Sequence, residues 1–124
     1  MADDCLFCGI RDGKPAVAKV YEDQLVYAIE VPAGSPLNRA PVHFLVIPNE
    51  HVPSALQMTA EQAPVAGRLF TVAAQLARAK GIAESGFRLL TNTGPDANQT
   101  VFHFHLHCLG GRQLGHEGGG PPQP

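Results

Sequence analysis

Apolar and polar positions along the chain follow two periods, one of about two residues and one of about 3.6 residues. Short apolar or alternating runs bounded by turn-forming residues predict five strands, at residues 17–21, 25–31, 42–47, 87–91 and 101–109. The run at 42–47 is almost continuously apolar and ends at Pro48, which predicts a central, buried strand. The three residues between the first two strands suit a hairpin.

One long segment shows helical spacing. Apolar residues recur at steps of four, three and four from Val65 to Leu76, and Gly81 follows as a stop. Pro64 lacks an N–H and is tolerated only in a first turn, so we expect the helix to begin near residue 62 or 63.

A shorter helix is predicted over residues 5–12, because Leu6, Phe7 and Ile10 fall on one side at helical spacing before Gly13 and Pro15 stop it. One short helix, one long helix and about five strands predict an α+β fold with an antiparallel sheet.

Composition narrows the class of protein. The 124 residues, 44% of them hydrophobic, suit one domain, which we expect at residues 1–114, followed by a Gly- and Pro-rich tail at 115–124. A net charge of −2 argues against nucleic acid as a partner. There is no apolar run of about 18 residues and no secretory signal pattern, so we expect no membrane association and a cytoplasmic location.

The most informative stretch is residues 103–109, where three histidines alternate with apolar residues. On a strand, His103, His105 and His107 would share one face while Phe104 and its apolar neighbours build the core on the other. One or two such histidines would be interpreted as a polar surface that faces solvent. Here, however, half of the chain's six histidines lie within residues 103–107, which has no structural motive.

A shared metal ion is the sharper alternative, since histidines two residues apart can bind one ion. His103 and His107 would lie about 13 Å apart at Cα on a strand, so one ion would not collect all three rings. We therefore expect the rings to have separate roles, among them nucleophile and hydrogen-bond donor to phosphate.

Further donors lie just before this strand, at Gly94 and in residues 98–100. No lysine follows residue 80, and the later arginines Arg88 and Arg112 lie outside the motif. These mainly neutral donors suit one phosphate better than a polyphosphate chain.

The histidine motif resembles the His-φ-His-φ-His-φ-φ signature of the histidine triad (HIT) family, and its continuation resembles the HINT branch of that family. The resemblance covers residues 5 to about 114 and rests on matches, in the same order, at residues 5–8, 20–23, 40–48, 86–94 and 103–113. It implies the HIT-like fold.

The resemblance implies a hydrolase that cleaves purine nucleoside 5′-monophosphate conjugates, phosphoramidates, at the α-phosphate. His105 would be the nucleophile that forms a nucleotidyl-histidine intermediate. His107 would contact the phosphate, and His43 would support the same network. The positions matching family residues that bind or orient the phosphate and leaving group are Asn92, Gln99 and Thr100.

Leu6, Phe7 and Ile10 match an apolar nucleoside pocket, although Leu6 and Ile10 are nearly as well explained as core residues. Family members carry an acidic residue near the end of the second strand that binds the ribose hydroxyls. Glu30 is the candidate here, but it is shifted by one residue, which would turn it to the other face of the strand.

The resemblance also implies a structural zinc site formed by Cys5, Cys8, His51 and His103. The cysteine pair alone is weak evidence, because a closed tetrahedron needs two more ligands. Free thiols are the alternative.

The family further implies a homodimer formed through the long helix and a central strand. Two other functions stay open at this point. One is hydrolysis of dinucleoside polyphosphates, and the other is a nucleotide-binding interaction module without useful turnover.

Overall fold

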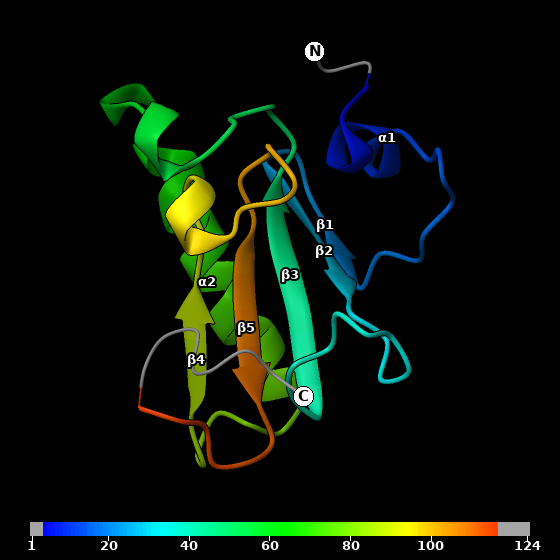
Figure 1. Ribbon diagram of the computed structural model, residues 1–124, viewed down its shortest axis with the longest axis vertical. Helices are drawn as coiled ribbons and strands as arrows, with labels where there is room; N and C mark the ends of the chain where they lie inside the picture. Colours follow the sequence, from blue (N-terminus) through cyan, green and yellow to red (C-terminus); the bar gives the residue numbers. More distant parts are fainter. Residues whose placement is uncertain (1–3, 117–124) are drawn as a thin grey trace.

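The computed structural model describes residues 4–116, and its centre is a five-stranded antiparallel sheet in the order β1-β2-β3-β5-β4 (Figure 1). The strands are β1 (Tyr21–Glu22), β2 (Val26–Glu30), β3 (Val42–Pro48), β4 (Phe87–Leu90) and β5 (Leu106–Gly110). The helices are α1 (Leu6–Arg11) and α2 (Ala63–Ala79), with short 3-10 turns at Ala55–Gln57, Ala60–Gln62 and Pro95–Ala97. The predicted fold class is confirmed. Within this range no helix has the length and apolar character needed to cross a membrane.

Two apolar clusters, one on each face, explain the continuous apolar run in β3. Phe44 and Val46 pack with α2 in the larger cluster, whereas Leu45 and Ile47 pack with α1 in the smaller one. Because successive side chains of a strand point to opposite faces, a strand covered on both faces must be apolar throughout. The predicted central position of this strand is therefore confirmed.

The long helix α2 begins at Ala63, where the position of Pro64 predicts its start. Pro64 is its second residue, where the missing N–H leaves no intrahelical bond unmade. Just before it, the Thr59 N–H donates to Oε1 of Gln62 at 2.8 Å, one half of a capping box. The helix buries one side against the sheet through Leu69, Val72 and Leu76.

The first predicted strand, at 17–21, is wrong except for its last residue. β1 contains only Tyr21 and Glu22, which pair with Ala28 and Tyr27 of β2. Residues 15–18 are exposed and lie outside the sheet, so they have no partner strand with which to form a β-ladder. The predicted hairpin is present.

The last strand begins five residues later than predicted, at Leu106 instead of residue 101. Its ladder with β3 begins at the pair Val46–Leu106. Upstream of it, the Phe104 N–H donates to the carbonyl of Val52, beyond the end of β3, at 2.6 Å. The segment 101–105 thus contacts the loop that comes after β3 and does not belong to the β3–β5 ladder. The predicted C-terminal tail lies, from residue 117 on, outside the described residues.

Asp23 closes the β1–β2 turn and ties it to α2. Its Oδ1 accepts from the N–H groups of Leu25 (2.8 Å) and Val26 (2.9 Å), and its Oδ2 accepts from the Tyr21 hydroxyl and from Nε of Arg68, both at 2.7 Å. Burial opposes ionisation of Asp23, but these hydrogen bonds outweigh it and lower its pKa well below the usual range.

We predict that Asp23→Ala lowers the free energy of unfolding by about 1–3 kcal/mol at pH 7. A carboxyl whose folded pKa is depressed stabilises the protein above the unfolded pKa of about 3.9, so this difference shrinks as pH falls below about 4. Urea unfolding at pH 7 and pH 3 measures both effects. Glu22→Ala is the control, because Glu22 is exposed and makes only a 3.4 Å ion pair with Lys19. Equal losses in the two variants would contradict the assignment.

Candidate active site and metal centre

Three histidine rings gather on the face of the sheet opposite α2. His107 lies in β5 and His105 immediately precedes that strand, with their ring centroids 5.0 Å apart. His43 lies in β3, and its Nε2 is 3.0 Å from Nδ1 of His107. Phe104, Leu106 and Cys108 point into the α2-side cluster, as the alternation predicts. The predicted alternation is therefore present from Phe104 to Cys108, whereas His103 lies before the strand.

The backbone fixes the tautomer of His105. Its Nδ1 lies 2.8 Å from the carbonyl oxygen of His103, so this nitrogen carries the proton and donates it. Burial lowers the pKa of His105, against the opposing effect of this hydrogen bond. The ring is therefore neutral at pH 7, and its Nε2 carries a lone pair.

A chain of hydrogen bonds sets the tautomers of His43 and His107. The backbone N–H of Arg39 donates to Nδ1 of His43 at 3.1 Å, so the proton of His43 lies on Nε2. That proton is donated to Nδ1 of His107, which leaves the proton of His107 on its own Nε2. Burial lowers the pKa of both rings, to about 4 for His43 and about 3 for His107, with further lowering by the Arg39 charge.

Nε2 of His107 is an unsatisfied donor. Within residues 4–116 it is the one buried side-chain nitrogen or oxygen atom without a hydrogen-bond partner. A buried N–H without an acceptor costs about 1–3 kcal/mol, so native structures rarely retain one without a functional reason. An acceptor oxygen of a bound phosphate would satisfy it.

The three predicted residues of α1 have different environments. Phe7 and Ile10 are buried in the smaller apolar cluster, whereas Leu6 is 47% exposed. Phe7 packs edge-on against His105, with ring centroids 5.0 Å apart, and the Tyr27 hydroxyl donates to its carbonyl at 2.6 Å. Phe7 therefore supports the ring of His105, and Leu6 is the α1 residue that is open to a ligand.

The loop between β4 and β5 contains the other predicted phosphate residues. Gln99 is buried, and its amide accepts from the Gly94 N–H at 2.9 Å and donates to Pro53 at 2.8 Å, so it braces the loop. Gly94 has a φ of 82°, which favours glycine at that turn. Asn92 is half-buried just beyond the end of β4, and Thr100 is exposed.

The structure does not bring Glu30 to the histidines. Ala28 faces the α2-side cluster and Glu30 follows it two residues later on the same face, where its carboxylate pairs with Lys80. Ile29 occupies the histidine face instead. The one-residue shift seen in the sequence thus removes the predicted ribose-binding carboxylate from the site.

Cys5, Cys8, His51 and His103 form a cluster whose ligand atoms lie within 4.8 Å of one another. Nδ1 of His103 is 3.2 Å from Sγ of Cys5, 3.5 Å from Sγ of Cys8 and 3.2 Å from Nδ1 of His51. Nε2 of His103 lies 2.8 Å from the carbonyl oxygen of Pro48 and donates to it, which turns the lone pair of Nδ1 toward the cluster. Two sulfur and two nitrogen donors make a closed metal-binding set.

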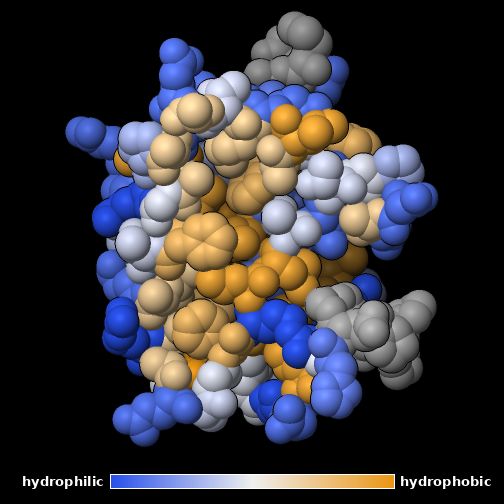
Figure 2. All heavy atoms as spheres, turned by 90° about the vertical axis from the view of Figure 1, so that its left-hand side faces the viewer, coloured by the Kyte–Doolittle hydropathy of each residue, from blue (hydrophilic) through white to orange (hydrophobic). Residues whose placement is uncertain are grey.

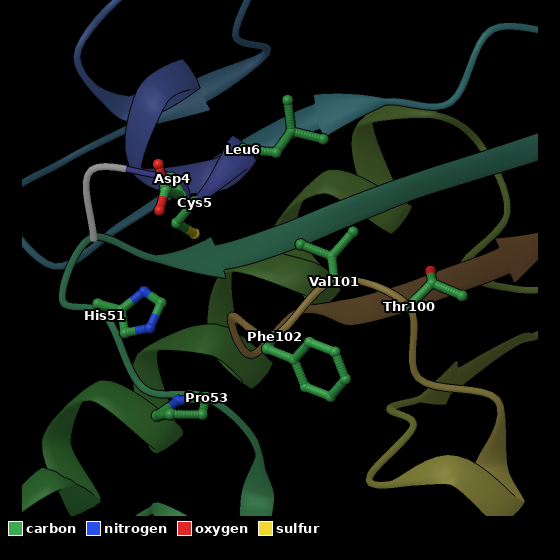
Figure 3. A pocket seen from close by; sticks show the side chains of 8 residues that line it. All are labelled: Asp4, Cys5, Leu6, His51, Pro53, Thr100, Val101 and Phe102. Carbon is green, nitrogen blue, oxygen red and sulfur yellow. The ribbon is translucent and has the colours of Figure 1, made fainter. Parts of the chain in front are cut away.

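A pocket of about 490 Å³ lies beside this cluster, between α1 and the loops around it (Figure 3). Cys5 and His51 contribute to its wall together with apolar side chains. The lining residues are Asp4, Cys5, Leu6, His51, Pro53, Thr100, Val101 and Phe102.

One contributor could not be found from the sequence. The backbone amide of Arg39 sets the tautomer of His43, and no residue pattern marks a main-chain N–H as functional. The only signal is position, because residue 39 lies in the loop four residues before His43.

Known proteins resemble this chain over nearly its whole length. The model of the family described as "HIT domain" matches residues 14–114. The chain is 43% identical over 115 residues to the purine nucleoside phosphoramidase of Escherichia coli (strain K12), with 93% of each chain covered. Solved structures of HIT family hydrolases are similar too. The structure from Legionella pneumophila has a TM-score of 0.85 at 34% identity, covering 91% of this chain and 97% of that one. The structure from Clostridium thermocellum has a TM-score of 0.84 at 39% identity, covering 93% and 96%.

We predict that His43 stays neutral down to about pH 5 and that this makes stability pH-dependent. A histidine whose folded pKa lies below the unfolded value of about 6.5 binds protons more readily in the unfolded state, so stability is lost as pH falls from about 6.5. The wild-type protein should lose unfolding free energy between pH 7 and pH 5, and in His43→Gln this loss should be smaller by about 1–2 kcal/mol. Denaturant titration at four pH values measures this slope. An unchanged slope, or His43 titrating near pH 6.5 by NMR, would contradict it.

Proposed function

This chain belongs to the HIT domain family, and we propose on that premise that it hydrolyses purine nucleoside 5′-monophosphate conjugates, phosphoramidates, at the α-phosphate. The observation that carries this proposal is the pairing of a neutral nucleophile with an unsatisfied donor. The lone pair on Nε2 of His105 and the N–H on Nε2 of His107 belong to rings whose centroids are 5.0 Å apart.

In the first proposed step, Nε2 of His105 attacks the α-phosphorus while the P–N bond breaks. The electron pair of that bond leaves with the amine nitrogen, which takes up a proton from solvent as it departs. The proton on Nδ1 stays hydrogen-bonded to the His103 carbonyl, and the partial negative charge of that carbonyl oxygen stabilises the positive charge that develops on the ring. The product of this step is a nucleotidyl-histidine.

In the second proposed step, water attacks the same phosphorus and His105 leaves as a neutral ring. The water loses one proton, so the reaction releases a nucleoside 5′-monophosphate and regenerates the enzyme. His107 donates its Nε2 proton in a hydrogen bond to a phosphate oxygen through both steps, and His43 holds it in that tautomer.

The nucleoside would lie against Leu6, with Phe7 and Ile10 as the wall behind it. Their burial and the contact of Phe7 with His105 support this arrangement. Thr100 and Asn92 are proposed to contact the phosphate or the leaving group, while Gln99 acts by holding the loop.

We propose that the Cys5–Cys8–His51–His103 cluster holds a structural zinc ion. Zn–N and Zn–S bonds of about 2.0 and 2.3 Å in a tetrahedron keep ligand atoms roughly 3.3–3.8 Å apart. Four of the distances between the cluster's donor atoms, at 3.2–3.5 Å, fit that requirement, and all of these atoms lie within 4.8 Å of one another. When bound, zinc would cross-link α1 to the segment before β5. Thiolate ligation requires reduced cysteines, which fits the predicted cytoplasmic location.

A homodimer through α2 and β4 is also proposed. β4 is an edge strand whose outer backbone groups have no partner strand within the described sheet. Figure 2 shows a broad apolar area on the side of the molecule where these two elements lie, and Phe70 of α2 is 52% exposed. A second copy would cover both the apolar side chains and the strand edge.

We predict that the protein hydrolyses an adenosine 5′-phosphoramidate and that His105→Asn lowers kcat by roughly a thousandfold or more while nucleotide binding persists. The control is His116→Asn, because His116 is exposed and outside the cluster of rings. Unchanged turnover in His105→Asn would remove this residue from the mechanism. Preferred cleavage of a diadenosine polyphosphate would assign a different substrate class, and binding without turnover of either compound would indicate an interaction module.

We predict that Cys8→Ser lowers bound zinc from one ion per chain to well below one and lowers the thermal midpoint. Elemental analysis and calorimetry measure the two effects. Cys108→Ala is the matched control, since Cys108 is buried in the α2-side core and its loss should destabilise the fold without removing zinc. Full zinc content in Cys8→Ser would refute the proposed ligand set.

A further inference from the structure

The loop that joins β2 to β3, residues 31–41, contains one side chain that bonds to both of its ends. This loop lies at the lower end of the sheet in Figure 1. Nδ2 of Asn38 donates to the carbonyl of Val31 at 2.9 Å, and Oδ1 of Asn38 accepts from the N–H of Ala40 at 3.1 Å. Asn38 is half-buried, so both polar groups of its carboxamide are committed to the backbone of the loop.

One of these two bonds encloses the peptide unit whose N–H orients His43. A carboxamide oxygen that accepts from the N–H two residues further on closes an Asx turn. The ring closed by Oδ1 of Asn38 and the N–H of Ala40 contains the peptide between residues 38 and 39, so a rotation of that peptide would break the turn. The N–H of this peptide is that of Arg39, which donates to Nδ1 of His43 at 3.1 Å. The turn therefore fixes the direction of the Arg39 N–H.

The other bond anchors Asn38 to a backbone partner of His43. The N–H of Val31 donates to the carbonyl of His43 at 2.9 Å, and the carbonyl of Val31 accepts from Asn38. Val31 thus connects the carboxamide to the residue whose ring accepts from the Arg39 N–H. Nη2 of Arg112 also donates to this loop, at 2.8 Å, but it bonds to the carbonyl of Arg39, which belongs to the next peptide.

The direction of the Arg39 N–H decides which nitrogen of His107 carries a proton. With this donor in place, the proton of His43 lies on Nε2 and is donated to Nδ1 of His107 at 3.0 Å. Without it, the proton of His43 can move to Nδ1, and Nδ1 of His107 then becomes the donor of the shared bond. Nε2 of His107 would then present a lone pair to a phosphate oxygen and repel it.

From these contacts we infer that Asn38 is a positioning residue, whose Asx turn directs the Arg39 N–H and thereby keeps a proton on Nε2 of His107. The inference rests on the proposed function, because a proton on this nitrogen matters to the reaction only if His107 binds the phosphate. The tautomers themselves exist without a substrate and can be measured without one.

The first measurement is NMR of the histidine ring nitrogens in the full chain at neutral pH, where the chemical shift distinguishes a protonated from an unprotonated nitrogen. We expect His43 and His107 of the wild type to carry their protons on Nε2. In Asn38→Ala, a substantial share of both rings should carry the proton on Nδ1. Tautomers that stay as in the wild type would overturn the inference.

The second measurement is kcat for an adenosine 5′-phosphoramidate. Removing a donor to a reacting oxygen altogether costs about 100-fold or more, and Asn38→Ala only releases the tautomer, so we expect kcat to fall by about tenfold. Asn38→Ser keeps an oxygen that can accept from the Ala40 N–H, so it should restore most of the wild-type tautomer and kcat. Asn38→Gln keeps the carboxamide but moves it outward by one methylene. It should behave like Asn38→Ala, and it carries the test if the alanine variant does not fold.

Ser35→Ala is the matched control in the same loop. Oγ of Ser35 accepts from the N–H of Leu37 at 3.1 Å, so it closes the same kind of turn two residues long. The enclosed peptide is not the one that donates to His43. Ser35→Ala should therefore leave both ring tautomers and kcat unchanged.

The outcomes separate the inference from the proposed function. Equal losses of kcat in Asn38→Ala and Ser35→Ala, with the tautomers unchanged, would reduce Asn38 to a structural residue and overturn the inference. A changed tautomer with an unchanged kcat would overturn it too. If the wild type itself does not turn over the conjugate, the proposed function is overturned, and the ring tautomers still decide whether Asn38 sets them.

Discussion

The geometry of the site depends on the three bonds made by His103. Its Nε2 donates to the carbonyl of Pro48 at 2.8 Å, its Nδ1 faces Cys5, Cys8 and His51, and its own carbonyl accepts from Nδ1 of His105 at 2.8 Å. One residue therefore links the end of β3, the candidate metal-binding cluster and the ring of His105. A shift of the His103 backbone would release the proton that fixes His105, so the position of the cluster and the reactivity of His105 cannot vary independently.

Apolar side chains cover both faces of the sheet, and the free energy gained by burying them offsets the cost of burying polar histidine rings. Phe44, Leu106 and their neighbours on the α2 side form the larger of the two apolar clusters, so the other face can hold histidines that burial keeps neutral. A neutral ring is what the proposed chemistry needs, since a protonated His105 would have no lone pair for attack. The low pKa values of the rings are thus a consequence of where the fold places them.

Most helices and strands could be predicted from the sequence because its strongest patterns are periodic. Three predicted patterns are present in the structure: the apolar run of β3, the helical spacing in α2 and the alternation around His105. They are present because each places apolar side chains where they pack in one of the two clusters. The four residues of the metal-binding cluster were predicted by resemblance, and the structure brings them together. The first strand was wrong at 17–20 and the last strand starts late because partner strands decide where pairing begins and ends. The role of the Arg39 amide was out of reach, since it depends on the path of a loop.

The donors that would face the attacked phosphate under the proposed function are neutral groups, and this choice has a physical reason. A guanidinium in direct contact with the attacked phosphate would hold the ground state tightly, whereas interactions that strengthen in the transition state raise kcat. The chain from the Arg39 amide through His43 to His107 delivers an oriented N–H without a formal charge.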